Sequence, residues 1–310
     1  IRQLRANRRK PNRAPSAVVD ARAVVHRARM VKDDAELALM ERAGAISAGK
    51  IHLTHGAAPW LTEDRMTGTW IILGAGSALA KAFAREAAKH GAHLILAGRN
   101  PQELATQEQD LRLRGAASVT CALFDAMNEQ HRGALVAMAA QAKAPVSLYW
   151  AIGTMPEEAA MRADAVLCTQ MVNSNFTSAM LTCNALLPLF EQQKAGAIVL
   201  LGSVAGDRGR KKNYQYGASK AGLAAYAQGL AAHLSAFQVP VLLVKPGVMD
   251  TPMTWGKKNP PLPLGVPEGL AKVCWQRAAR GGTLYYPWFW WPIMLAILHL
   301  PRKIFNKLNF

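Results

Sequence analysis

Between about Gly68 and Trp255, short apolar runs alternate with alanine-rich segments that carry a helical pattern. Apolar runs of about four to eight residues are typical of strands whose two faces are both buried, and the segments between them are long enough to form crossover helices. The alternation therefore predicts βαβ units and an α/β fold with a parallel sheet. We expect strands at residues 70–73, 93–97, 118–124, 146–150, 197–201 and 241–244.

The segment after the fifth predicted strand contains Tyr216 and Lys220 at a spacing of one helical turn, and Ser203 belongs to a Gly-Ser that follows that strand. Reduction of a ketone with a nicotinamide requires a proton for the developing alkoxide. A phenol has an ordinary pKa of about 10, so we expect the nearby ammonium of Lys220 to lower the pKa of Tyr216. The hydroxyl of Ser203 can donate to the same carbonyl oxygen. The alternative is an exposed tyrosine and a solvated lysine beside a turn.

The turn after the first predicted strand opens a helix that we expect to extend to about His90, and it reads Gly74-Ala75-Gly76-Ser77-Ala78-Leu79-Ala80. A glycine-containing turn between a strand and a helix lets the pyrophosphate of a dinucleotide approach the helix N-terminus. Alanines occupy later positions where glycines are usual, and they could shift the pyrophosphate. We assign four residues of this turn to a cofactor site: Gly74, Gly76, Ser77 and Leu79.

Two polar residues follow the second and third predicted strands. Arg99 stands where an acidic residue would bind the ribose 2′-hydroxyl of NAD, and a guanidinium there suits a 2′-phosphate, which favours NADPH. Asp125 is a candidate acceptor for the adenine amino group. Each has a simpler interpretation, because Arg99 could be a surface residue and Asp125 a turn or helix cap.

With these motifs in order, residues from about 68 to 255 resemble the short-chain dehydrogenase/reductase family. The resemblance implies a Rossmann-like, doubly wound parallel sheet and an oxidoreductase that reduces a ketone to an alcohol. It also implies a tetrad in which Tyr216 donates the proton and Lys220 binds the nicotinamide ribose and lowers the tyrosine pKa. Ser203 would orient the carbonyl, and Asn175, with Asn173 as its competitor, would hold a helix kink and a water that leads to Lys220.

Further cofactor contacts are implied by the same resemblance. Ala151 and Gly153 belong to an Ala-Ile-Gly that replaces the usual Asn-Ala-Gly, and Pro246, Gly247 and Thr251 would lie near the nicotinamide carboxamide. The degenerate glycine turn and the replaced asparagine are the two departures from the family pattern.

A narrower resemblance involves the segments 202–210, 244–247 and 250–254. They resemble the branch of the family that contains decaprenylphosphoryl-2-keto-β-D-erythropentose reductase, which implies a keto-sugar on a polyprenyl phosphate as the substrate. Alternatives are a reductase of small or lipid ketones without a sugar phosphate, and a non-catalytic NADPH-binding protein.

A basic loop lies between the serine and the tyrosine of the tetrad, and its cations could clamp a substrate phosphate: Arg208, Arg210, Lys211 and Lys212. The alternative is an ordinary solvated loop. The whole chain has 37 basic and 20 acidic residues and a formal net charge of +17, which indicates an anionic surface or substrate as a partner. We expect no nucleic-acid partner, and a homo-oligomer is left open.

The C-terminal residues 284–300 are aromatic and apolar, and Arg302, Lys303 and Lys307 follow them. Because Pro287 and Pro292 interrupt this short segment, we expect it to lie in the membrane interface rather than to span the bilayer. The protein would then be cytoplasmic and peripheral at the inner face of an anionic membrane. The alternative is an element that completes the core or a dimer contact.

We therefore divide the chain into an N-terminal extension (1–66), a reductase domain (67–283) and a membrane-associating segment (284–310). Residues from about 18 to 50 resemble a helical linker of aminopeptidase P, but that family's metal ligands are not found downstream. We expect residues 1–65 to be a fusion or a mis-started reading frame, with Met66 as the initiator.

Four scattered cysteines without a CxxC spacing fit a reducing compartment, and no metal site is expected.

Overall fold

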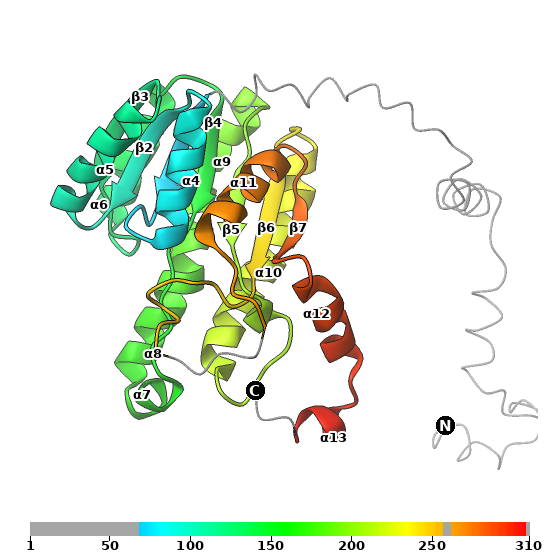
Figure 1. Ribbon diagram of the computed structural model, residues 1–310. Coiled ribbons are helices and arrows are strands. Elements are labelled where there is room, and N and C mark those ends of the chain that lie inside the picture. Colours follow the sequence, from blue (N-terminus) through cyan, green and yellow to red (C-terminus); the bar gives the residue numbers. More distant parts are fainter. Residues whose placement is uncertain (1–67, 257–261, 308–310) are drawn as a thin grey trace, which may run out of the picture. The chain divides into compact units, whose positions relative to one another are not determined.

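The computed structural model describes residues 68–256 and 262–307, so the predictions for residues 1–66, including the aminopeptidase P resemblance and the start at Met66, lie outside the described residues. Within the described part, seven strands form one parallel sheet in the order β3-β2-β1-β4-β5-β6-β7 (Figure 1). The strands are β1 (Thr69–Leu73), β2 (His93–Gly98), β3 (Ser118–Leu123), β4 (Val146–Trp150), β5 (Ile198–Leu201), β6 (Val241–Pro246) and β7 (Gly282–Tyr286). The predicted fold class is confirmed.

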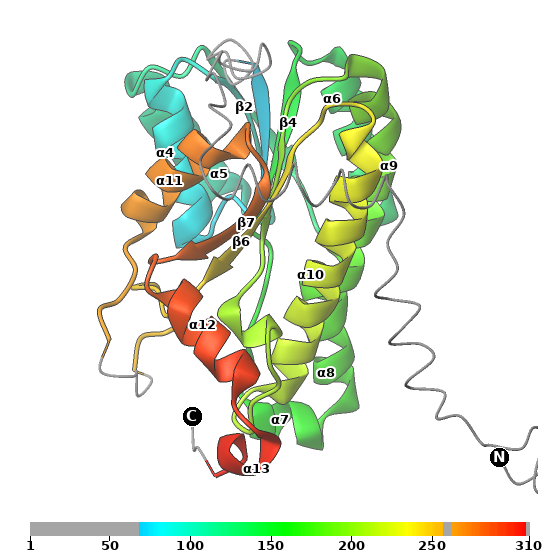
Figure 2. The ribbon, with the colours of Figure 1, turned by 90° about the vertical axis from the view of Figure 1, so that its right-hand side faces the viewer.

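Helices cover both faces of the sheet. One layer contains α4 (Ala78–Lys89), α5 (Pro101–Leu113) and α11 (Pro267–Ala278), and the other contains α6 (Glu129–Gln141), α9 (Ser178–Gln193) and α10 (Tyr214–Ser235). Figure 2 shows these two layers on opposite sides of the strands. Because both faces are covered, β1, β4 and β5 are buried along their whole length, which is why they read as unbroken apolar runs in the sequence.

Alternation along β1 divides the core into two layers. Trp70 packs on the side of α4 and α11, and its ring centroid lies 4.9 Å from that of Phe83. Phe83 in turn stacks on Tyr149 of β4 with 3.9 Å between the ring centroids. Ile71 and Leu73 face the opposite layer, as the two-residue period of a strand requires.

The position of a binding site follows from the strand order. β1 pairs with β2 on one side and with β4 on the other, so the winding direction of the chain reverses between β1 and β4. In open parallel sheets, the crevice for a ligand lies beyond the carboxyl ends of the strands at this reversal. The short elements that surround this edge are α7 (Glu158–Ala163), α8 (Ala165–Val172), the π-helical turn η3 (Asn173–Thr177) and the 3₁₀ turn η4 (Val204–Gly206).

The C-terminal segment differs from its prediction. Leu284, Tyr285 and Tyr286 do not begin a membrane segment, because they belong to β7 and pair with Val244, Lys245 and Pro246 of β6. The following α12 (Trp290–His299) and α13 (Arg302–Phe305) contribute buried side chains to a small core, as the alternative interpretation had it. None of the helices in residues 68–256 and 262–307 has the length and the apolar character that crossing a bilayer would require.

Candidate active site

Asn175 lies at the centre of a π-helical turn that interrupts the junction of α8 and α9. Single π-turns widen a helix locally and are frequent at functional sites. Here the turn directs the fully buried amide of Asn175 at the loop after β4, where its Oδ1 accepts from the Thr154 amide at 2.7 Å and its Nδ2 donates to the Thr154 carbonyl at 2.8 Å. Nδ2 also lies 3.2 Å from Ser219 Oγ, which links it to α10. Asn173 only begins the turn and is half-buried, so Asn175 is the buried member of the predicted pair.

Lys220 is buried inside α10, with 4% of its surface exposed. Its Nζ donates to the carbonyl oxygen of Leu201, the last residue of β5, at 2.9 Å. Both Lys220 Nζ and Asn175 Oδ1 lie within 3.4 Å of the position that a Cβ on Gly153 would take. The structure therefore brings the predicted lysine and asparagine together around Gly153, and only a glycine leaves the space between them open.

Tyr216 and Ser203 complete the predicted tetrad. Ser203 begins η4, where its Oγ accepts from the Ala205 amide at 3.1 Å, and its hydroxyl is also hydrogen-bonded to Tyr216. The Lys220 Nζ lies 6.0 Å from the centroid of the Tyr216 ring. All four residues thus converge at the carboxyl ends of β4 and β5.

The expected direction of the Tyr216 pKa is wrong for this structure. Burial raises the pKa of Tyr216 to about 12, although the hydrogen bond with Ser203 acts in the lowering direction. Burial also lowers the pKa of Lys220 to about 8, because a buried ammonium loses its hydration. Desolvation outweighs the hydrogen bond with Ser203, and the phenol therefore holds its proton at neutral pH.

A cavity of about 530 Å³ opens next to the tetrad, at the strand-order reversal. The predicted cofactor residues that line it come from the segments that follow β1, β2, β3 and β4: Gly74, Gly76, Ser77, Arg99, Asp125, Ala151 and Gly153. The other predicted contacts, Leu79, Lys220, Pro246, Gly247 and Thr251, are not among its lining residues. Lys220 borders it through Gly153, as described above.

The glycine turn fits a dinucleotide at its first position. Gly74 has a φ of +75°, which side chains rarely adopt, and a Cβ there would lie 3.0 Å from the Ala151 backbone. Ser77 begins α4 and accepts from the Ala80 amide at 3.2 Å, so the helix N-terminus faces the cavity with its positive end. These features form the cradle that a pyrophosphate requires.

Glu103 is a feature of this turn that the sequence analysis missed. Its Oε2 lies 2.9 Å from the position of a Cβ on Gly76, and its Oε1 forms an ion pair with Lys81 at 2.6 Å. A carboxylate beside a phosphate site is unfavourable, and the Lys81 ammonium neutralises it. No spacing motif marks this pair in the sequence, because the two residues lie on neighbouring helices, α4 and α5.

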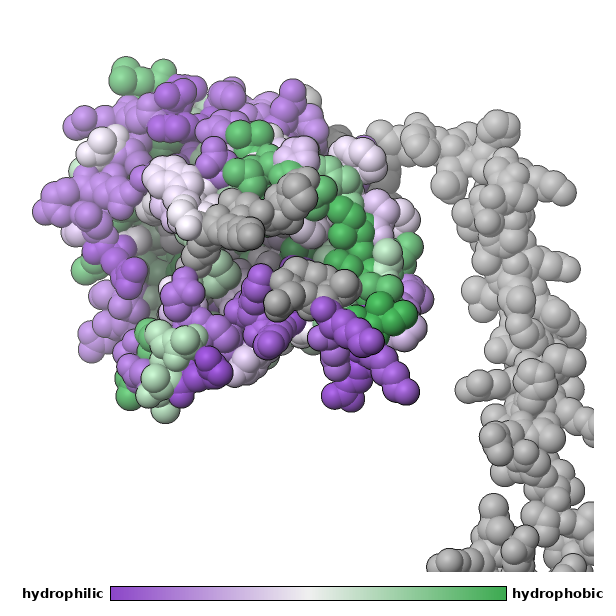
Figure 3. All heavy atoms as spheres, turned by 60° about the horizontal axis from the view of Figure 1, so that its bottom comes forward, coloured by the Kyte–Doolittle hydropathy of each residue, from purple (hydrophilic) through white to green (hydrophobic). Residues whose placement is uncertain are grey.

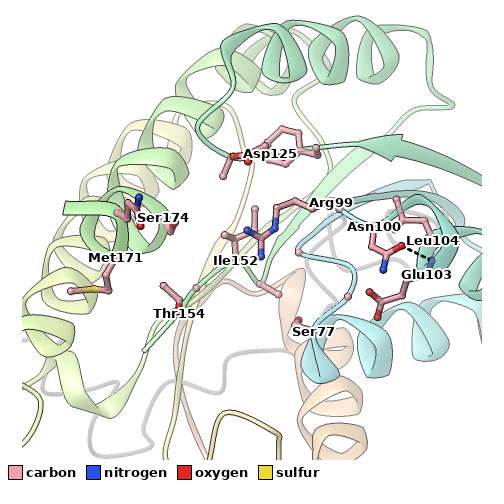
Figure 4. Close-up of a pocket in the computed structure, with 18 of the residues that line it drawn as sticks. Ser77, Arg99, Asn100, Glu103, Leu104, Asp125, Ile152, Thr154, Met171 and Ser174 are labelled. Atoms are coloured by element: carbon pink, nitrogen blue, oxygen red, sulfur yellow. Dashed lines mark hydrogen bonds between the residues drawn. The ribbon is translucent and has the colours of Figure 1, made fainter. Parts of the chain in front are cut away.

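Arg99 and Asp125 occupy the cavity side of the sheet edge. Figure 4 shows Arg99 reaching from the end of β2 into the cavity toward Ile152. Asp125 lines the cavity and also accepts from the Met127 amide at 2.9 Å, so it caps a turn as its simpler interpretation proposed. Asn100 lies between Arg99 and α5. Its Oδ1 caps that helix by accepting hydrogen bonds from the amides of Gln102 and Glu103.

The basic loop divides into two pairs of cations. Arg208 donates to the Ile297 carbonyl at the end of α12, and its guanidinium lies 3.9 Å above the centroid of the Phe305 ring. Arg210 donates to the Val204 carbonyl at 3.2 Å and also contacts the Met294 sulfur of α12 at 3.5 Å. These two arginines therefore hold the C-terminal helices, whereas Lys211 and Lys212 are exposed. Of the four cations that were predicted to clamp a phosphate, Lys211 and Lys212 are therefore the two that remain exposed to solvent.

A buried polar cluster behind this loop was also missed. Asp207 forms an ion pair with Lys245 of β6 and accepts from the hydroxyl of Tyr285 of β7 at 2.8 Å. It fastens the loop that follows Ser203 to the edge of the sheet. The cluster was not predictable, because Tyr285 was assigned to a membrane segment and not to a strand next to β6.

Comparison with known proteins decides the family. A family model described as short chain dehydrogenase matches residues 69–261. The chain belongs to this family. An uncharacterized oxidoreductase of Mycobacterium tuberculosis is 32% identical over 249 residues, which cover 79% of this chain and 99% of that protein. A 3-oxoacyl-acyl-carrier-protein reductase of Chlamydia muridarum is 26% identical over 215 residues, which cover 64% of this chain and 83% of that protein.

Among solved structures, a variant of the actinorhodin polyketide ketoreductase with NADPH superposes with a TM-score of 0.64. It is 22% identical, and the match covers 72% of this chain and 96% of that chain. At this identity the likeness concerns the fold. Family membership makes the protein an oxidoreductase that uses a nicotinamide dinucleotide.

The burial of the Lys220 ammonium can be tested by the pH dependence of the free energy of unfolding. Below about pH 8 the lysine is protonated in the folded and unfolded states, and its burial destabilises the fold. Between about pH 8 and its ordinary pKa, the folded state releases the proton first, so the wild type gains stability relative to Lys220→Met. We expect a relative gain on the order of 2–3 kcal/mol from pH 7 to pH 10.5 in urea unfolding.

The control is Lys272→Met, which replaces an exposed lysine of α11 and should follow the wild type at every pH. Parallel pH profiles for the wild type and Lys220→Met would show that the ammonium is not buried as described.

Proposed function

We propose that the protein is an NADPH-dependent reductase that converts a ketone into an alcohol, and that its substrate is a keto-sugar on a polyprenyl phosphate. The observation that carries the cofactor choice is the Arg99 guanidinium inside the cavity, at the end of β2. No acidic residue stands there to bind a ribose 2′-hydroxyl, because the strand ends in Gly98-Arg99-Asn100. A guanidinium binds a 2′-phosphate through charge-assisted hydrogen bonds.

The tetrad supports reduction rather than a purely binding role. A bound nicotinamide would supply the hydride. Tyr216 would give its proton to the developing alkoxide, and its raised pKa keeps that proton in place at neutral pH. Ser203 would donate to the same oxygen, and the Lys220 ammonium would hold the ribose beside Gly153. A non-catalytic protein has no use for a buried lysine that destabilises its fold.

The substrate proposal rests on the surroundings of Ser203. Val204 contacts the apolar inner face of α12, and the exposed Lys211 and Lys212 lie farther along the same loop. An apolar wall next to a pair of cations suits a molecule with a hydrocarbon part and a phosphate. With this substrate the protein would act from the cytoplasm, peripherally at the inner face of the membrane.

A second candidate substrate is a small or lipid ketone without a sugar phosphate. It is favoured by the apolar environment of Tyr216, which packs with Met161 and Met171. Methionines fill irregular space and adapt to varied apolar ligands.

The cofactor choice is tested by Arg99→Ala. Loss of the guanidinium should raise KM for NADPH about 10- to 100-fold, because it removes contacts of about 1.5–3 kcal/mol to the 2′-phosphate, and it should leave KM for NADH unchanged. Arg114→Ala, on the outer end of α5, is the matched control. An equal loss with both cofactors would contradict the assignment to the 2′-phosphate.

The substrate choice is tested by NADPH oxidation with a polyprenyl-phosphate keto-sugar and with uncharged soluble ketones. We expect the lipid-linked sugar to have the higher kcat/KM, and Lys211→Gln/Lys212→Gln to raise KM for this substrate only. Arg208 is left intact, because its replacement would also release α12. A preference for the uncharged ketones, unaffected by the double variant, would favour the second candidate.

A further inference from the structure

The outer face of α12 and α13, together with the turn before α12, carries large apolar side chains that the described residues leave exposed. Exposed fractions are 78% for Trp288, 58% for Trp291, 46% each for Leu295 and Leu298, and 52% for Ile304. Trp291, Leu295 and Leu298 are spaced by three or four residues and share one face of α12, and Trp288 extends the stripe from the turn before the helix. A continuous exposed stripe of this kind marks an interaction surface.

This stripe cannot turn inward, because the opposite face of α12 is already packed. Trp290, Met294 and Ile297 are buried in a cluster with Val204 and Phe305. The Trp290 indole lies directly against Gly247, where even a methyl group would overlap it. The Arg208 guanidinium binds the Ile297 carbonyl and the Phe305 ring, which fixes the far end of the helix.

The charged side chains around the stripe in the sequence are all basic. Arg302, Lys303 and Lys307 are all exposed, and no acidic residue occurs from Gly281 to Lys307. Figure 3 shows apolar atoms beside a strongly hydrophilic group on the right of the lower face, on the side where Figure 1 places α12 and α13. Tryptophans next to basic residues are the combination that settles at the headgroup level of an anionic bilayer.

We propose that Trp288, Trp291, Leu295, Leu298 and Ile304, together with Arg302, Lys303 and Lys307, form a docking face for an anionic membrane. This proposal deepens the proposed function, on which it rests for its biological use. Because the inner face of the same helix contacts Val204 and Gly247, docking would hold the substrate side of the active site at the lipid surface. A lipid-linked ketone could then reach Tyr216 without leaving the membrane.

A second copy of the chain fits this face less well. In a symmetric dimer, the same surface patch meets itself, so the three cations of one protomer would lie next to those of the other. Like charges at an interface are costly, whereas anionic headgroups neutralise them. Charge complementarity therefore favours the membrane as the occupant.

The test is sedimentation of the full chain with vesicles of phosphatidylcholine, with or without phosphatidylglycerol. We expect the wild type to bind the phosphatidylglycerol vesicles and to be released by salt. Arg302→Gln/Lys303→Gln/Lys307→Gln should weaken this binding about 100-fold, from three contributions of about 1 kcal/mol each. Lys272→Gln/Arg277→Gln/Arg280→Gln, the same charge change on exposed residues of α11 and the turn after it, should bind like the wild type.

A second variant removes the apolar part, Trp291→Ser/Leu295→Ser/Leu298→Ser, with Leu113→Ser on α5 as its control. We expect the triple variant to lose vesicle binding and the control to retain it. The proposal of a docking face is contradicted if the wild type binds neither kind of vesicle. It is also contradicted if the Arg302/Lys303/Lys307 variant and the Trp291/Leu295/Leu298 variant both bind vesicles like their controls, or if the apolar variant only converts a dimer into a monomer.

Affinity for NADPH, measured by quenching of protein fluorescence, separates this proposal from the proposed function. It should be the same in the wild type and in both triple variants, because the docking face does not line the cofactor cavity. Loss of vesicle binding with intact NADPH binding concerns the docking face alone. Vesicle binding by a protein that fails to reduce any ketone would contradict the proposed function and leave the docking face standing.

Discussion

The candidate active site depends on where the ammonium of Lys220 is held. This group is buried, and its hydrogen bond to the Leu201 carbonyl joins α10 to the end of β5. The same bond sets the distance between the helix that carries Tyr216 and the turn that carries Ser203. Burial lowers the pKa of the lysine and raises that of the tyrosine. At neutral pH the tyrosine stays protonated at no cost, whereas burial of the lysine ammonium weakens the fold.

Asn175 and Gly153 form another side of the site, next to the buried Lys220 ammonium. A π-turn at Asn175 widens the helix junction, and the amide is held by the backbone of Thr154. Gly153 leaves the space into which Lys220 Nζ and Asn175 Oδ1 both face. The departure from the usual Asn-Ala-Gly affects the first two positions of this loop, Ala151 and Ile152, and not the glycine that the geometry requires.

The sheet was predictable because its strands are buried on both faces, which makes apolar runs such as Trp70–Leu73 visible in the sequence. The four residues of the tetrad were named from their spacing together with the family resemblance, but the pKa values of Tyr216 and Lys220 were not predictable, because they depend on burial. β7 was missed since Leu284–Tyr286 continues into an aromatic run that reads as a membrane segment. Arg208 and Arg210 were assigned to the substrate because the helix they hold is distant in the sequence.

The central claim is that Tyr216 completes a hydride transfer from NADPH to a ketone. It is tested most directly with NADPH that carries deuterium at both C4 positions of the nicotinamide, by mass spectrometry of the alcohol. We predict one deuterium on the carbinol carbon with the wild type. We predict a rate at least about 100-fold lower with Tyr216→Phe, which should still bind NADPH. Deuterium transfer by Tyr216→Phe at the wild-type rate, or an alcohol without deuterium, would contradict the account.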